Sequence, residues 1–364
     1  MKFKLNFFIL FGIKIFSSSI GNLFKIYNFN TKFSVMWPVF DKGQTWISIQ
    51  QAELGSQASD RMLERTRQQV MAQTVGTYFD LLLAQSQVTV VEKTLQTAQA
   101  HQRIVQNRHE GGLAVKSDLL RDVVHVAELE QQLLQVKSLE EITQSMLNAC
   151  MGISEKNRYR LETPLKRGEV ISEPMNHWID TALSKRPDYL FMRDQREIAQ
   201  KEVQKQRAAH LPSVNLMGDY ELNSEDYNDV GDNYTVGVMV NLNLFAGNRI
   251  SAKVREALAN LKAAESRLTG LEQQVRVETQ RAYLQSQNAW QRMDASEAAV
   301  TQAEENLRIV KSRYENGLLT IVELLDSEVA FQRAQTNFLQ AVHDHQVAKA
   351  QLELAAGTLE PSNY

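Results

Sequence analysis

Two carboxylates three residues apart are the most distinctive charged pair in this sequence. Glu323 and Asp326 follow Thr320, and residues i and i+3 of a helix lie on one face. The spacing Thr-x-x-Glu is also that of a capping box, in which both side chains satisfy the backbone at a helix start. The pair therefore predicts a concentration of negative charge or, for Glu323, a helix cap. Capping does not explain Asp326.

No other arrangement in the sequence predicts catalysis or metal binding. His343 and His345 are two residues apart, which points them to different faces of a helix. Cys150 is the sole cysteine, so it forms no intramolecular disulfide, and we expect it to pack at a helix end. Glycine-rich phosphate loops, nucleophile–histidine patterns and zinc motifs are missing. We expect no enzyme activity, no metal and no cofactor.

The composition predicts the elements that position these carboxylates. Only six prolines occur in 364 residues, and they leave residues 39–163 and 213–360 free of proline. With 16 glycines, such runs are typical of very long helices. A mean hydropathy of −0.35 argues against a helical membrane transporter, and a net charge of −3 gives no sign of a nucleic-acid binder.

An internal repeat organises most of the chain. Shifted by 205 positions, residues 40–152 align with residues 245–357 without a gap. The matches include Tyr78 with Tyr283, Arg108 with Arg313, Gly112 with Gly317 and Gly152 with Gly357. Aligned tyrosines, arginines and glycines in one register indicate a duplication rather than generic helical composition.

We expect each copy to contain a helical hairpin that turns at a glycine. Apolar residues at steps of three, four and seven predict a helix over 248–314, which at 1.5 Å per residue spans roughly 100 Å. The returning helix covers 320–356 after the turn at Gly317. The first copy repeats this over 44–109 and 117–150, with its turn at Gly112. Further helices are expected over 175–210.

Strands are expected before the first hairpin and between the two hairpins. From Tyr234 to Leu244 apolar residues occupy every second position, the period and length of a tilted membrane-spanning strand. Residues 213–245 therefore predict a β-hairpin, and residues 33–40 a further strand. A soluble sheet with one wetted face has the same pattern, so the alternation alone leaves both readings open.

Residues 1–30 differ in composition from the rest of the chain. Two lysines precede an apolar run and a cluster of small residues, which is typical of a secretory signal. A start unrelated to the rest of the chain is the alternative. The expected organisation is this N-terminus, a partial first repeat over 31–152 and a second repeat over 153–360.

The sequence resembles the TolC-like outer-membrane factor family. The resemblance covers about residues 33–360 and is strongest over the segment from Tyr314 to Asp326, with its glycine turn, Thr-Ile-Val and paired carboxylates. Arg186-Pro187-Asp188 and the strand end Leu244-Phe-Ala-Gly247 are further similar pieces. No single motif is very specific. Their order, spacing and duplication together carry the resemblance.

The resemblance implies a mainly α fold with few β-strands. Long coiled-coil hairpins would form a periplasmic α-barrel, and the strands would form a transmembrane β-barrel in the outer membrane. It also implies a homotrimer that contacts outer-membrane lipid, a periplasmic adaptor and an inner-membrane pump of RND or ABC type. The expected function is a passive exit duct for small molecules or proteins, in efflux or type I secretion.

The resemblance also implies roles for individual residues at a periplasmic gate. Glu323 and Asp326 would stand at the constriction, where three chains would form two rings of carboxylates that attract cations. Tyr314 and Asp118 match family residues that hold the closed state by hydrogen bonds between hairpins. Leu319 stands where the family can carry a basic residue, so one closing interaction lacks its counterpart.

Two further expectations concern a missing part of the first repeat and an alternative class of protein. The repeat arithmetic predicts that about eighty residues of the first copy are missing, which leaves strand 33–40 without its hairpin partner and three strands per chain. We therefore expect a truncated and impaired channel. The alternative is a periplasmic coiled-coil adaptor or scaffold without a pore, although an adaptor has one hairpin rather than two.

Overall fold

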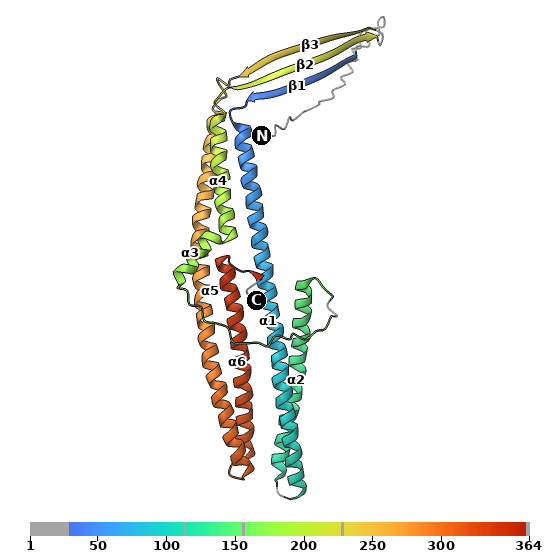
Figure 1. Cartoon of the computed structure of the whole chain (residues 1–364), viewed down its shortest axis with the longest axis vertical. Coiled ribbons are helices and arrows are strands. Elements are labelled where there is room, and N and C mark those ends of the chain that lie inside the picture. Colours follow the sequence, from blue (N-terminus) through green and yellow to red (C-terminus); the bar gives the residue numbers. More distant parts are fainter. Residues whose placement is uncertain (1–28, 113, 155–156, 227–228, 362–364) are drawn as a thin grey trace. The chain divides into compact units, whose positions relative to one another are not determined.

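The computed structural model describes residues 29–112, 114–154, 157–226 and 229–361. Three strands and six helices follow one another in these residues (Figure 1). Their bounds are β1 Phe29–Phe40, α1 Gln44–Glu110, α2 Lys116–Met151, α3 Met175–Lys185, α4 Pro187–Ala208, β2 Ser213–Asp226, β3 Asp229–Asn241, α5 Arg249–Glu315 and α6 Ile321–Ala356. The expectation of a mainly α fold with few strands is confirmed. None of the helices in the described ranges is long and apolar enough to cross a bilayer.

The chain divides into two compact units. The first extends to Ala58 and resumes over Met192–Leu268, so it holds all three strands. The second comprises Ser59–Phe191 and Thr269–Tyr364, so it holds both hairpin turns. Helices α1, α4 and α5 contribute residues to each unit.

The first unit contains one antiparallel sheet in the order β1-β2-β3. Strand β1 pairs with β2 from Phe29 opposite Ser224 to Phe40 opposite Val214. The strand expected to lack its hairpin partner pairs with β2 of the second repeat, and the absence of that hairpin partner stays a prediction. It begins at residue 29, inside the segment set apart as the N-terminus, and β3 ends at Asn241 rather than at residue 245. Pro38 has no N–H to donate, and it lies on an outer strand beside an irregularity in the register, where proline is tolerated.

The two faces of this sheet differ in chemistry. The register aligns Phe33 with Tyr220 and Tyr234, Val35 with Gly218 and Val236, and Trp37 with Leu216 and Val238. Their side chains share one face because side chains two apart on a strand point the same way. On the other face Lys32 forms ion pairs with Asp219 at 3.4 Å and with Glu221 at 2.8 Å. One face is therefore apolar and the other polar.

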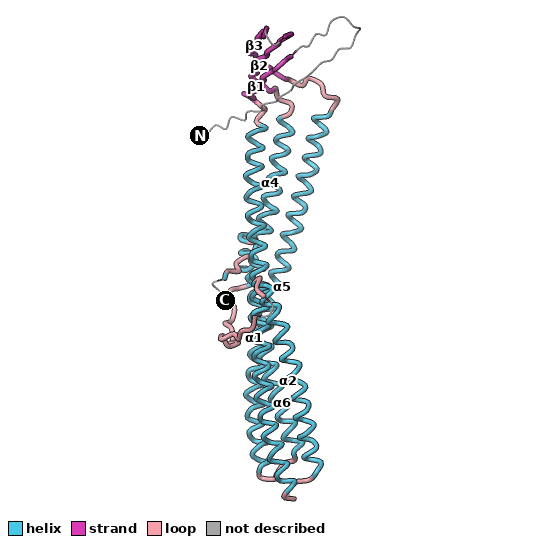
Figure 2. Tube along the Cα trace, turned by 90° about the vertical axis from the view of Figure 1, so that its right-hand side faces the viewer, coloured by secondary structure: helices cyan, strands magenta, loops and turns pink. Residues whose placement is uncertain are grey.

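The second unit consists of two helical hairpins and the segments that join them. Helices α1 and α2 form one hairpin and α5 and α6 the other, and their turns lie at the same end of the unit (Figures 1 and 2). Small apolar clusters hold the helices together, such as Leu95 and Ala98 with Val126 and Leu129. The segment after α2 adds Leu165 to a cluster around Met293.

The helices expected over 175–210 are α3 and α4. Helix α3 ends at Lys185, and Arg186 is extended, with φ −63° and ψ 119°. Proline at position 187 causes this break, because a residue before proline is driven out of the α region. Pro187 then serves as the first residue of α4, where its missing N–H costs nothing.

Candidate functional site

Both hairpin turns of the second unit are made at the expected glycines. Gly112 has φ +74° and Gly317 has φ +73°, a left-handed conformation that other residues adopt only with strain. Their N–H groups donate to His109 and Tyr314 respectively, each at 2.9 Å. The turns thus place Asp118 just after Gly112, and Glu323 and Asp326 just after Gly317.

Glu323 caps the start of α6. Its Oε2 accepts hydrogen bonds from the backbone N–H of Thr320 at 2.8 Å and from the Thr320 hydroxyl at 2.9 Å. These bonds lower the pKa of the Glu323 carboxyl. The capping reading therefore has direct geometric support, whereas membership of a charged ring requires further chains and stays a prediction.

Asp326 is exposed one turn beyond Glu323. Within the described residues it takes part in no hydrogen bond or ion pair, so its carboxylate is available to solvent or to another chain. Asp118 lies in the first turn of α2 and is half-buried. The carboxylates after the two turns thus differ, since only Glu323 is bound by its own helix start.

Tyr314 lies against the first hairpin. Its ring centroid is 5.4 Å from that of His101 on α1. Burial raises the pKa of the Tyr314 hydroxyl, and the nearby carboxylates Asp122 and Asp118 add to the effect. Within the described part of this single chain, no hydrogen bond joins Tyr314 to Asp118. That expected bond between hairpins stays a prediction, and Leu319 is half-buried beside the turn.

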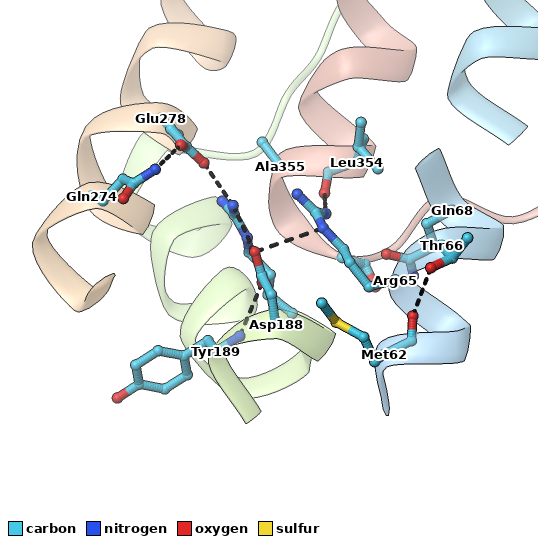
Figure 3. Close-up of polar contacts among 12 residues, drawn as sticks. Met62, Arg65, Thr66, Gln68, Asp188, Tyr189, Gln274, Glu278, Leu354 and Ala355 are labelled. Carbon is cyan, nitrogen blue, oxygen red and sulfur yellow. Dashed lines mark hydrogen bonds and ion pairs between the residues drawn. The ribbon is translucent and has the colours of Figure 1, made fainter. Parts of the chain in front are cut away.

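A charge network around the buried Arg186 joins α1, α4, α5 and the end of α6 (Figure 3). Arg186, whose side chain is 3% exposed, binds Asp188 through Nε at 2.8 Å and Glu278 through Nη2 at 2.6 Å. Arg65 approaches Asp188 at 3.6 Å and donates to the carbonyl of Leu354 at 3.2 Å. Burial alone would lower the pKa of Arg186, but Asp188 and Glu278 raise it.

The sequence does not predict this network, which we call the Arg186 junction and which consists of Arg65, Arg186, Asp188 and Glu278. Arg186 and Asp188 were noted only for their resemblance to the family, and Arg65 and Glu278 carry no local motif. The buried member is Arg186, and its bonds to Asp188 and Glu278, with the contact of Arg65 to Asp188, link four chain segments.

The two histidines of α6 have different surroundings and do not form a metal pair. His343 Nε2 lies 2.8 Å from Asp80 Oδ1 on α1, and His345 Nε2 lies 3.2 Å from the carbonyl oxygen of Glu169. No group of three histidine, cysteine or acidic side chains among the described residues has the geometry to hold a metal ion. A groove of about 750 Å³ between α5 and α6 is lined by polar and apolar side chains, His343 and Asp344 included.

Comparison with known proteins gives consistent results. Residues 17–152 and 178–358 match the family described as outer membrane efflux protein. The match therefore includes residues 17–30, which the sequence reading had set apart from the repeats. Its two segments follow the internal duplication.

Individual relatives and structures agree with this match. The alkaline protease secretion protein AprF of Pseudomonas aeruginosa is 22% identical over 91% of this chain and 70% of its own length. Outer membrane protein TolC of Vibrio cholerae is 27% identical over 86% of this chain and 74% of its own. The crystal structure of the outer membrane protein VceC of Vibrio cholerae has a TM-score of 0.80 at 18% identity, and covers 96% of this chain and 86% of that one.

Proposed function

Because the chain belongs to the outer membrane efflux protein family, we propose that it is the exit duct of a tripartite efflux pump or a type I secretion system. The protein lies in the outer membrane, with its helical part in the periplasm. As a duct it would act by providing a path, and the proposal gives it no covalent chemistry.

The two-faced sheet is the observation that carries this proposal. Val236 on β3 is 74% exposed and Tyr234 is 78% exposed, although both lie on the apolar face. Such a face is costly in water and favourable against lipid, where every second residue of a membrane strand is apolar. The opposite face, with Lys32, Asp219 and Glu221, has the polarity of a water-filled lumen.

We propose that the working form is a homotrimer. Within the described residues β1 and β3 each pair with β2 alone, so they are the outer strands of the sheet. An unpaired edge in lipid leaves backbone groups without hydrogen-bond partners, which costs several kcal/mol per group. Pairing β1 of one chain with β3 of the next would cover both outer strands, in a parallel contact because each of them is antiparallel to β2. The expected impairment of the channel stays a prediction that a conductance measurement answers.

At the periplasmic end we propose a gate built from the residues beside the hairpin turns. Asp326 would supply a ring of three carboxylates that favours cations and opposes closure. Tyr314 and Asp118 would hold neighbouring hairpins together in the closed state. Glu323 would contribute to the charge while serving first as a cap. Accordingly, Asp326→Asn should reduce cation selectivity more than Glu323→Gln does.

The proposed partners are a periplasmic adaptor and an inner-membrane pump of the RND or ABC type. One relative is named for protease secretion and the family for efflux, so the cargo class is left as small molecules or proteins. An exposed apolar sheet face does not support the alternative of a periplasmic adaptor without a pore, because such a protein would expose this face to water.

Membrane fractionation with a matched pair of sheet variants tests the proposal. Val236 and Thr235 are neighbours on β3 that point to opposite faces. Val236→Lys should abolish the outer-membrane trimer, seen as a heat-sensitive band on gels, because lysine on a lipid face costs about 2–4 kcal/mol. Thr235→Lys should leave it intact. Equal loss or equal tolerance in the two variants would contradict a lipid-facing sheet.

A further inference from the structure

A cluster of titratable side chains is buried between the two hairpins near their turns. It contains His101 on α1, Asp122 and His125 on α2, and Glu328 on α6. Asp122 is 2% exposed, His125 9% and Glu328 11%. These groups lie beside Tyr314, yet the gate described above does not use them.

Each histidine of the cluster faces a carboxylate. His101 Nδ1 lies 3.2 Å from Asp122 Oδ1, which joins the two helices of the first hairpin. His125 Nε2 lies 3.9 Å from Glu328 Oε2, which brings the first hairpin next to the second. The latter distance is too long for a hydrogen bond but is that of an ion pair once the imidazole is protonated.

The cluster is incompletely satisfied as it stands. Among the described residues His101 Nε2, Asp122 Oδ2 and His125 Nε2 are buried without hydrogen-bond partners. Burial raises the pKa of the Glu328 carboxyl, and the neighbouring His101 and His125 oppose this effect. A buried carboxylate beside a neutral imidazole is unfavourable, whereas the same carboxylate beside an imidazolium is compensated. Adding protons therefore stabilises the cluster.

The second hairpin shows what the same positions contain when they do not titrate. A shift of 205 residues converts His101 and Asp122 into Asn306 and Ser327. Asn306 Nδ2 donates to Ser327 Oγ at 3.4 Å, so the neutral pair also joins two helices of a hairpin. A neutral pair meets the structural need. The titratable pair stands only in the first hairpin, where it adjoins His125 and Glu328.

We propose that His125 and Glu328, with His101 and Asp122, form a latch that positions the gate and tightens on protonation. An imidazole is the side chain that ordinarily changes charge between pH 5 and 8. Acidification compensates the buried carboxylate at the contact between α2 and α6 and holds the two hairpins of one chain together. The closed gate is then favoured at mildly acid pH, and the link weakens as pH rises.

Other charged groups around the latch come from α1, α2 and α5. Arg108 on α1 and Asp118 on α2 act on Tyr314, and Lys311 on α5 acts on Glu328. Lys311 favours the ionised form of Glu328, which is the form that pairs with protonated His125. This inference rests on the proposed function in one respect: the closed state that the latch favours is the closed state of the proposed gate.

Spin-label distance measurements on the full chain test the latch without requiring conduction. In a Cys150→Ser background, Glu130→Cys on α2 and Ala330→Cys on α6 place labels at exposed positions of the two hairpins. Labelled chains are diluted with unlabelled ones so that distances within one chain dominate. Between pH 8 and pH 5.5 we expect the close-spaced population to rise about tenfold relative to the open one, within the usual range of coupling between sites.

Matched variants decide whether this response belongs to the latch. His125→Gln and Glu328→Gln keep size and polarity but remove titration, and each should abolish the pH response. His210→Gln, at an exposed histidine of the first unit, should retain it. A response that persists in both latch variants, or a wild type without one, overturns the proposal.

Conductance of the same samples separates the two proposals. A chain with pH-dependent spacing that never conducts supports the latch and contradicts the exit-duct function. A chain that conducts, but in which the distance between the hairpins does not change with pH, supports the exit-duct function and overturns the latch.

Discussion

The two hairpins have the same backbone and different chemistry. Helices α1 and α5 are each 67 residues long, and α2 and α6 are each 36. The returning helices end at Gly152 and Gly357, whose φ angles are +68° and +72°. A shift of 205 residues maps every one of these bounds onto its counterpart. The duplication has thus preserved the length, the turn and the end of each hairpin.

The differences between the copies are concentrated at positions that bear charge. Thr320, which binds the cap residue Glu323, is replaced by Val115 in the first copy, so Asp118 has no such partner. The neutral pair of the second hairpin is the His101–Asp122 pair in the first. The comparison teaches that the repeat determines the scaffold, while single substitutions give each hairpin its own electrostatic behaviour.

The largest contrast between the copies is expected at the helix ends. Gly152→Ala should cost about 1–2 kcal/mol of unfolding free energy, because alanine is strained at positive φ but meets no neighbour. At Gly357 a Cβ would also lie 2.7 Å from Arg186 Cα, so Gly357→Ala should cost about 2–5 kcal/mol in total. Denaturant unfolding of both variants in detergent measures the difference. Equal losses would show that the Arg186 junction does not constrain the end of α6.

A smaller contrast is expected where the returning helices begin. Thr320→Val should cost about 1 kcal/mol and speed amide exchange in the first turn of α6 about fivefold. Val115→Ala removes no cap and should leave the first turn of α2 unchanged. Hydrogen exchange followed by mass spectrometry measures both turns in one experiment. Unchanged exchange at 321–324 in Thr320→Val would refute the capping role of the Thr320 hydroxyl.

The smallest effect concerns the pH dependence of stability. Burial alone would lower the pKa of His343, but hydrogen bonds to Asp80 and Asp344 raise it. The contribution of His343 to the free energy of unfolding is therefore fully present below the ordinary pKa of histidine. It is lost as pH rises through the raised pKa of His343. The first copy has Ser138 at this position, so it has no imidazole there to contribute to the pH dependence.

Thermal unfolding at pH 5.5 and pH 8.5 tests this sign. His343→Gln should lose less than about 1 kcal/mol, and only at the lower pH. His210→Gln, at an exposed site, serves as the control and should behave as the wild type at both pH values. A loss in His343→Gln that is equal at the two pH values would exclude a contribution from its titration.

Much of the scaffold could be predicted from the sequence because it depends on local signals. Apolar periodicity, the glycines at 112 and 317 and the scarcity of proline determine where each hairpin begins, turns and ends. The break between α3 and α4 at Arg186 also depends on a local signal, the proline at position 187. The pairing of β1 with β2 could not be read, since the partners are almost two hundred residues apart.

The chemistry between helices was harder to predict than the helices themselves. Glu323 was readable because its partner Thr320 is three residues away. His125 and Glu328 are 203 residues apart, and Arg65 and Asp188 are 123 apart, so no spacing rule brings them together. Only the packing of one hairpin against the other creates these clusters. The alignment of the two copies is the one sequence signal that points to this cluster, because it sets the titratable His101 against the neutral Asn306.

Single-channel recording from the purified full chain in planar bilayers tests the central claim most directly. The account predicts discrete conductance steps from a trimer, with cation selectivity that falls in Asp326→Asn and no steps from Val236→Lys. A folded chain that inserts into the bilayer as a monomer and gives no steps would contradict the claim that this protein is an outer-membrane exit duct.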